Sequence, residues 1–167
     1  MLGMQVTSAE ANKLLKKIYN EREALYEKER ERERYHAAVG EDPDELKPDY
    51  NLDEVRKEIE DLNRDEMEIK HALNLFNATT KVGGGYDYTI DQVLIRLPQL
   101  NTELRRLDTM RMRPSKVRAG ITGSVIDYIY TSYDPEAAKE YHWSVQEEID
   151  ELQIALDKVN TTVKFDI

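Results

Sequence analysis

Apolar residues recur every three or four positions over residues 52–76, and this spacing constrains the fold more than any other feature of the chain. The series consists of Leu52, Val55, Ile59, Leu62, Glu66, Ile69, Leu73 and Phe76. Such a heptad pattern predicts a helix that buries one narrow stripe against a partner helix. Glu66 is its one polar member. A charge there sets register or partner choice if it is paired, or lies where the helices open to water.

An earlier helix is expected from Ser8 to about Val39, because Thr7 and Glu10 form a capping box ahead of another apolar stripe. The run "EKERERER" at 27–34 has no apolar stripe. We therefore expect a solvated, charged helical arm over about 22–39 that projects beyond the main core. Gly40, Pro43 and Pro48 then interrupt the helix.

Two more helices are predicted downstream. One begins after Thr89 as N-cap and ends near Arg113, with a kink at Pro98. The other takes Asp134 as N-cap and Pro135 as its first residue. Their expected buried positions are Ile90, Val93, Leu97, Leu100, Leu104 and Leu107, then Ala138, His142, Val145, Ile149, Leu152, Leu156 and Val159. The chain is thus expected to be mainly α, as an antiparallel long-helix hairpin or coiled-coil-like four-helix bundle in a single domain over 1–167.

Residues 117–133 depart from this pattern, because they are rich in β-branched and aromatic side chains. They predict one or two strands, such as a hairpin about the "TG" in their middle. Two strands alone are marginal in water, so they should lie on the helices or pair with another chain. Tyr128, Tyr130 and Tyr133 are accordingly expected to be buried against the helices, with an oligomer contact as the alternative.

Three consecutive glycines at 83–85 invite comparison with a phosphate-binding loop. Such a loop follows a strand and ends in Gly-Lys-Ser/Thr. Here a predicted helix precedes the glycines, Lys81 lies on the wrong side of them, and Asp87 would repel an anion. The glycines instead predict positive φ angles in a tight bend between two helices.

Charge excludes some partners and suggests others. The net charge of −10 argues against non-specific nucleic-acid binding. Residues 96–118, which include Arg111, hold seven basic and two acidic residues and so carry +5, which leaves −15 for the remainder. This basic segment is expected to pair with acidic helices of the same or a neighbouring subunit.

Catalytic and metal chemistry find little support in the sequence. The chain contains no cysteine and no Gly-x-Ser-x-Gly elbow. "ERYH" (Glu33, His36) and "EIKH" (Glu68, His71) match the Glu-x-x-His motif of di-iron bundles. The apolar stripe places Glu68 beside the seam and His71 on the outer face, which argues against a buried metal centre. His142, the one histidine in a seam, is expected to be a packed, hydrogen-bonded imidazole.

Two segments resemble a known family. "LFNATTKVGGGYDYTIDQVL" and "DPEAAKEYHWSVQEEIDELQIALDKVNTTVKFDI" are similar to the glycine loop and the closing helix of the septicolysin-like family of small bacterial proteins. The resemblance implies a small, mainly helical protein. The cytolysin label in the family name implies membrane permeabilisation, and no catalytic residues are carried over.

These observations lead to three functional hypotheses. The first is a non-enzymatic, cytoplasmic protein that self-associates through helix faces and the strand segment, without a cofactor, nucleic acid or small-molecule substrate. Its specificity would come from Glu66, Arg111, Tyr128, Tyr130, Tyr133 and His142. The second is a membrane-active cytolysin. Two observations argue against it: the apolar residues of every predicted helix lie in a narrow seam, and no run approaches the roughly 18 consecutive apolar residues that span a bilayer. The third is a carboxylate-metal enzyme.

Overall fold

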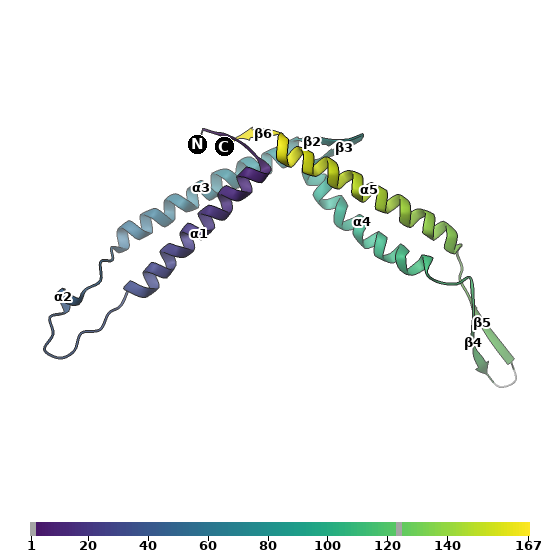
Figure 1. Ribbon diagram of the computed structural model, residues 1–167, viewed down its shortest axis with the longest axis horizontal. Coiled ribbons are helices and arrows are strands. Elements are labelled where there is room, and N and C mark those ends of the chain that lie inside the picture. The colour runs from purple at the N-terminus through teal and green to yellow at the C-terminus, as the bar shows by residue number, and fades with distance from the viewer. Residues whose placement is uncertain (1–2, 123–124) are drawn as a thin grey trace. The chain divides into compact units, whose positions relative to one another are not determined.

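The computed structural model describes residues 3–122 and 125–167 (Figure 1). Within these ranges the protein is mainly helical, as the periodicity predicts, with five helices and three pairs of antiparallel strands. In chain order the elements are β1 (Gln5–Thr7), α1 (Ser8–Arg32), α2 (Pro43–Leu46), α3 (Leu52–Thr79), β2 (Lys81–Gly83), β3 (Tyr86–Thr89), α4 (Ile90–Arg111), β4 (Lys116–Thr122), β5 (Val125–Tyr130), α5 (Pro135–Thr162) and β6 (Lys164–Asp166). The chain, expected as one domain, divides into two compact units, Met1–Phe76 with Asn160–Ile167, and Asn77–Val159.

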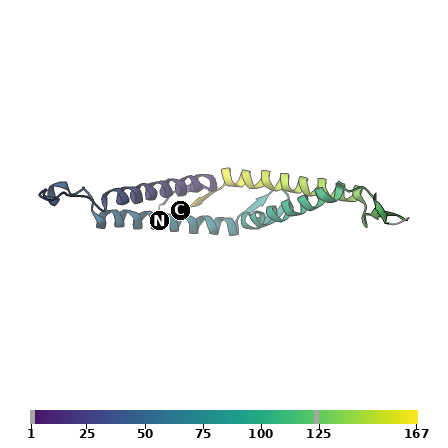
Figure 2. The same cartoon turned by 90° about the horizontal axis from the view of Figure 1, so that it is seen from below.

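In the first unit α1 and α3 lie side by side (Figures 1 and 2). The core between and beside them comprises Val6, Ala11, Ile18, Ile69 and Ile167, with Leu14, Leu15, Leu62, Ala72 and Phe165 packed against it. β1 pairs antiparallel with β6, which places Val6 opposite Phe165. The Phe165 ring stacks on Phe76 with 4.6 Å between ring centroids. These contacts extend the core past the two helices to the strand pair.

In the second unit α4 and α5 lie side by side (Figure 2). The buried residues on their facing sides are Ile90, Val93, Leu100 and Leu107 of α4, and Ala138, Val145, Ile149, Leu152, Ala155, Leu156 and Val159 of α5. The buried positions expected on these helices are therefore confirmed except at Leu97, Leu104 and His142, which are half-buried. Polar contacts add to them: the Arg96 guanidinium donates to both carboxylate oxygens of Glu148 at 2.9 and 3.1 Å, a bidentate geometry that fixes the register of the two helices.

The helix start signals are confirmed as well. The Thr7 amide donates to the Glu10 carboxylate at 2.8 Å, and the Glu10 amide donates to the Thr7 hydroxyl at 3.2 Å, which is the expected capping box of α1. Asp134 accepts from the Glu136 amide at 3.0 Å, and Pro135 is the first residue of α5. These contacts satisfy backbone donors that the first turn of a helix leaves without partners.

The predicted extent of the first helix is wrong, because α1 ends at Arg32 and not near Val39. Tyr35 and Val39 are exposed, so no apolar packing holds this stretch in helical form. The charged helical arm expected over 22–39 is also wrong, because Arg22 contacts α3. The Tyr50 hydroxyl donates to Glu29 at 2.7 Å and so holds the returning chain beside the last turns of α1.

The glycine segment is a bend, as predicted, but it lies in a β-hairpin that the sequence did not predict. β2 pairs with β3, and Gly83, Gly84 and Gly85 have φ angles of +73°, +67° and +91°. The Tyr86 hydroxyl at the start of β3 donates to Glu151 on α5 at 2.6 Å. This hydrogen bond raises the pKa of Tyr86 to about 12. The hairpin is thereby fixed against α5.

Candidate functional site

The strand segment forms a hairpin of β4 and β5, as predicted, although Gly123 of the expected turn lies outside the described residues. Lys116 is opposite Tyr130, and Arg118 is opposite Tyr128. Cross-strand partners share a face, so these four side chains lie on one side of the hairpin. The Lys116 ammonium lies 3.9 Å from the centroid of the Tyr128 ring, a cation–π contact. We call these four residues the cation-aromatic face.

The hairpin exposes its large side chains. Tyr128 and Tyr130 are 46% and 63% exposed, so the expectation that they are buried against the helices is wrong. Val117 and Ile129, which are cross-strand partners on the opposite side, are also exposed. Both sides of a two-stranded ribbon therefore present apolar surface to water. Tyr133 differs: it is half-buried, and its hydroxyl donates to the Met110 carbonyl at 2.9 Å.

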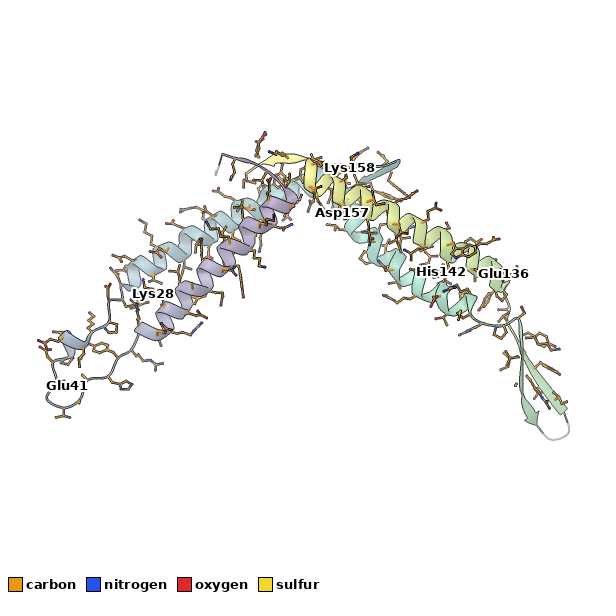
Figure 3. All side chains as sticks on the ribbon, in the orientation of Figure 1. Lys28, Glu41, Glu136, His142, Asp157 and Lys158 are labelled. Carbon is orange, nitrogen blue, oxygen red and sulfur yellow. The ribbon has the colours of Figure 1, made fainter. Side chains whose placement is uncertain are left out.

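Arg111 and His142 meet at a carboxylate near the end of α4. The Arg111 guanidinium binds Asp108 at 2.6 Å. Figure 3 labels His142 on α5, where its Nε2 lies 3.6 Å from Asp108 Oδ1, which is longer than a hydrogen bond. His142 Nδ1 is buried and makes no hydrogen bond within the described ranges, so the expectation of a hydrogen-bonded imidazole is wrong there. The structure thus brings two candidate residues together, in a contact that links α4 to α5.

Glu66 lies in the other unit and is paired. Arg22 of α1 donates to Glu66 and, at 2.8 Å, to Asn63, while Lys70 binds the second Glu66 oxygen. The Glu66 and Arg22 side chains are only 22% and 18% exposed. The hydrogen bonds from Lys70 and then from Arg22 hold the pKa of Glu66 below its ordinary value of 4.5. The polar member of the heptad seam therefore aligns α3 with α1, one of the two roles that the sequence left open.

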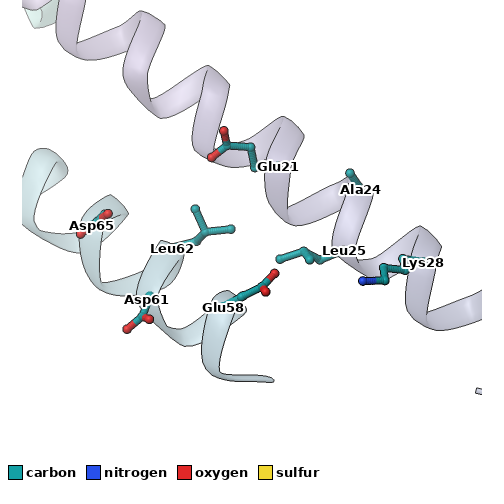
Figure 4. A pocket seen from close by; sticks show the side chains of 8 residues that line it. All are labelled: Glu21, Ala24, Leu25, Lys28, Glu58, Asp61, Leu62 and Asp65. Carbon is teal, nitrogen blue, oxygen red and sulfur yellow. The ribbon is translucent and has the colours of Figure 1, made fainter. Parts of the chain in front are cut away.

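A groove between α1 and α3 was not anticipated from the sequence. It has a volume of about 500 Å³ and is lined by Glu21, Ala24, Leu25, Lys28, Glu58, Asp61, Leu62 and Asp65. Figure 4 shows Leu25 and Leu62 pointing toward each other across it. Four of the lining residues are acidic and one is basic. The signal was present in the sequence, because Glu58, Asp61 and Asp65 repeat at helical spacing beside the seam residue Leu62.

The two Glu-x-x-His matches lie in different surroundings. Glu33 and His36 follow the end of α1, so they do not lie on a helix as a bundle metal site requires. His71 is exposed on α3, as predicted, and Glu68 is half-buried. Among the described residues, no three His, Cys, Asp or Glu side chains are grouped so as to hold a metal ion. In the same part of the chain, no helix has the length and apolar character needed to cross a membrane.

Comparison with known proteins addresses the fold. No protein-family model matches the chain, and no curated protein matches it. The crystal structure of a functionally unknown conserved protein from Corynebacterium diphtheriae matches with a TM-score of 0.58 at 14% sequence identity, over 97% of this chain and 99% of that one. The chain is therefore similar in fold to that protein.

Proposed function

We propose that this protein is a non-enzymatic interaction protein that self-associates through the β4–β5 hairpin and through helix faces. The main support for this proposal is that five large apolar or aromatic side chains are exposed on a ribbon of two strands: Val117, Ile126, Tyr128, Ile129 and Tyr130. An isolated two-stranded ribbon is marginally stable in water, and its outer edges present unpaired backbone donors and acceptors. Contact with another molecule would cover both the apolar side chains and the edges.

Exposed apolar side chains on the helices support the second part of the proposal. Leu94 and Ile95 on α4, and Trp143 and Ile154 on α5, are each at least half exposed. Exposed apolar side chains mark a protein–protein interaction surface where they form a contiguous patch. We include in this proposal the antiparallel, coiled-coil-like four-helix bundle expected from the seams. We also include a cytoplasmic location, because a chain without cysteine fits a reducing compartment.

The solution mass of the wild type and of a doubly substituted hairpin tests this proposal. Light scattering on a sizing column should give a mass above the 19.5 kDa of one chain, and Tyr128→Ser with Tyr130→Ser should lower that mass toward 19.5 kDa. Tyr19→Ser with Tyr35→Ser is the matched control, because these tyrosines are also exposed but are not part of the hairpin. Wild-type protein that stays at 19.5 kDa at every concentration would contradict self-association.

A membrane-active role is the second candidate, and the cation-aromatic face favours it. Lys116 and Arg118 lie beside exposed tyrosines, and such a combination suits the boundary between lipid headgroups and acyl chains. The resemblance to the septicolysin-like family points the same way. Dye release from vesicles containing about one-third phosphatidylserine, at low micromolar protein, should then occur and should be lost in the Tyr128→Ser, Tyr130→Ser variant. Intact vesicles would remove this candidate.

A further inference from the structure

The cation-aromatic face and the α1–α3 groove are complementary in charge and in polarity. The cation-aromatic face combines Lys116 and Arg118 with the rings of Tyr128 and Tyr130. Neither cation makes an ion pair within the described ranges, and the Lys116 ammonium lies over the two rings at 3.9 and 5.3 Å. Two positive charges and two aromatic rings therefore face water on one side of the hairpin.

The α1–α3 groove has the opposite character. Its apolar floor includes Leu25 and Leu62, and Glu58 and Asp65 of α3 line it without an ion pair among the described residues (Figure 4). Its volume of about 500 Å³ lies within the range of 300–1,000 Å³ that is typical of pockets which bury a ligand. A ligand that fits this groove has an apolar or aromatic body and carries positive charge at its edge.

We propose that the cation-aromatic face of one copy binds in the α1–α3 groove of a second copy. This inference rests on the self-association proposed above and names its two surfaces. Tyr128 and Tyr130 would contact Leu25 and Leu62, and the cations would approach the carboxylates at the groove edge. The aromatic contact would supply affinity, because exposed ion pairs contribute little. The charges would select the orientation and raise the association rate.

A second copy is favoured over other occupants by charge. Nucleic acid and an anionic lipid surface both attract the hairpin, but the rest of the chain is strongly acidic and would be repelled by either. The acidic groove, in contrast, is present on every copy of the chain. Each copy then contributes one hairpin and one groove, so a single hairpin–groove contact leaves a groove free on one copy and a hairpin free on the other, unless the two copies exchange both.

Reciprocal charge reversal tests this pairing. The hairpin variant carries Lys116→Glu and Arg118→Glu, and the groove variant carries Glu58→Lys and Asp65→Lys. Each should remain near 19.5 kDa alone, because like charges then face each other. An equimolar mixture should regain the wild-type mass distribution with the two variants in a 1:1 ratio. A single chain that carries all four substitutions should also associate, which shows that the substitutions leave the protein able to fold.

A charge reversal on α3 outside the groove separates a local effect of the groove carboxylates from a change in net charge. Glu54→Lys with Glu60→Lys adds the same charge to α3 at exposed positions outside the groove and should leave the wild-type mass unchanged. A groove variant that keeps the wild-type mass would overturn the groove inference while leaving self-association standing. A mixture that stays at 19.5 kDa would also overturn the inference. Monomeric wild-type protein would remove both this inference and the proposed function.

Discussion

At the residue scale, Glu66 shows how a charge is accommodated in an apolar seam. The carboxylate is half-buried and accepts from a lysine one turn along its own helix and from an arginine of the facing helix. Removal of this carboxylate leaves the half-buried Arg22 without its ion-pair partner. An unpaired charge that is partly buried lowers the free energy of unfolding. Because the pair is still partly in contact with water, its loss costs less than that of a fully buried pair.

We therefore predict that Glu66→Gln lowers the free energy of unfolding by about 1 kcal/mol at pH 7. The pKa of Glu66 is lowered in the folded state, so its contribution is present above about pH 4.5 and is lost as the pH falls through the lower, folded pKa. Thermal unfolding followed by circular dichroism should show the variant below the wild type at pH 7, and a smaller difference at a pH below 4.5. Glu60→Gln, on the exposed side of α3, is the control and should match the wild type at both pH values.

At the element scale, glycine is required in the β2–β3 turn for two separate reasons, the backbone conformation and the space beside α5. Gly83 and Gly84 both have positive φ angles, which a side chain strains. At Gly83 an added Cβ would meet open space, whereas at Gly84 it would lie 3.3 Å from the Cβ of Ala155 on α5. The positive φ angles are a requirement of the turn itself, whereas the lack of space at Gly84 results from the packing of the turn on α5.

Alanine substitutions should separate the cost of backbone strain from the cost of the contact with Ala155. Gly83→Ala should cost about 1 kcal/mol of unfolding free energy through backbone strain. Gly84→Ala should cost more, because Ala155 must also move. Urea unfolding of the two variants measures the difference, and adding Ala155→Gly to each variant tests its origin. Equal stability losses at the two glycines would show that the turn does not pack on α5 in solution.

The elements also show how far sequence reasoning reaches. Buried positions on α4 and α5 were predictable because burial follows the helical period there. The end of α1 was not, because Tyr35 and Val39 continue the helical spacing in the sequence, and only the structure shows that neither residue finds a packing partner. Burial of Tyr128 and Tyr130 was predicted wrongly, since β5 has apolar residues on both faces and no alternation marks an outer side. The groove was not predicted, because helical periodicity identifies the residues of the apolar seam but does not show where two helices separate enough to leave an opening.

At the scale of the whole molecule, the charge division between the hairpin and the groove predicts a dependence on salt and concentration. Raising the ionic strength from about 0.15 M to about 1 M shortens the screening length from roughly 8 to roughly 3 Å. The average mass should therefore rise with protein concentration, and sodium chloride should lower it only modestly, because the aromatic contact supplies most of the affinity and the charges mainly set orientation and association rate. Analytical ultracentrifugation measures both trends. A mass that increases with salt would instead show that apolar helix faces dominate the contact.

The separate locations of the hairpin and the groove have a consequence for any assembly that they form. A row of copies joined hairpin to groove has two unlike ends, one with a free groove and one with a free hairpin, and so has a direction. It grows until the row closes on itself or meets a copy that has only one working surface. A chain with a disabled hairpin is such a copy: it still offers its groove to the end that carries the free hairpin, and growth there stops. A small fraction of such chains would shorten the whole population, so a lesion in one surface would be dominant over intact copies.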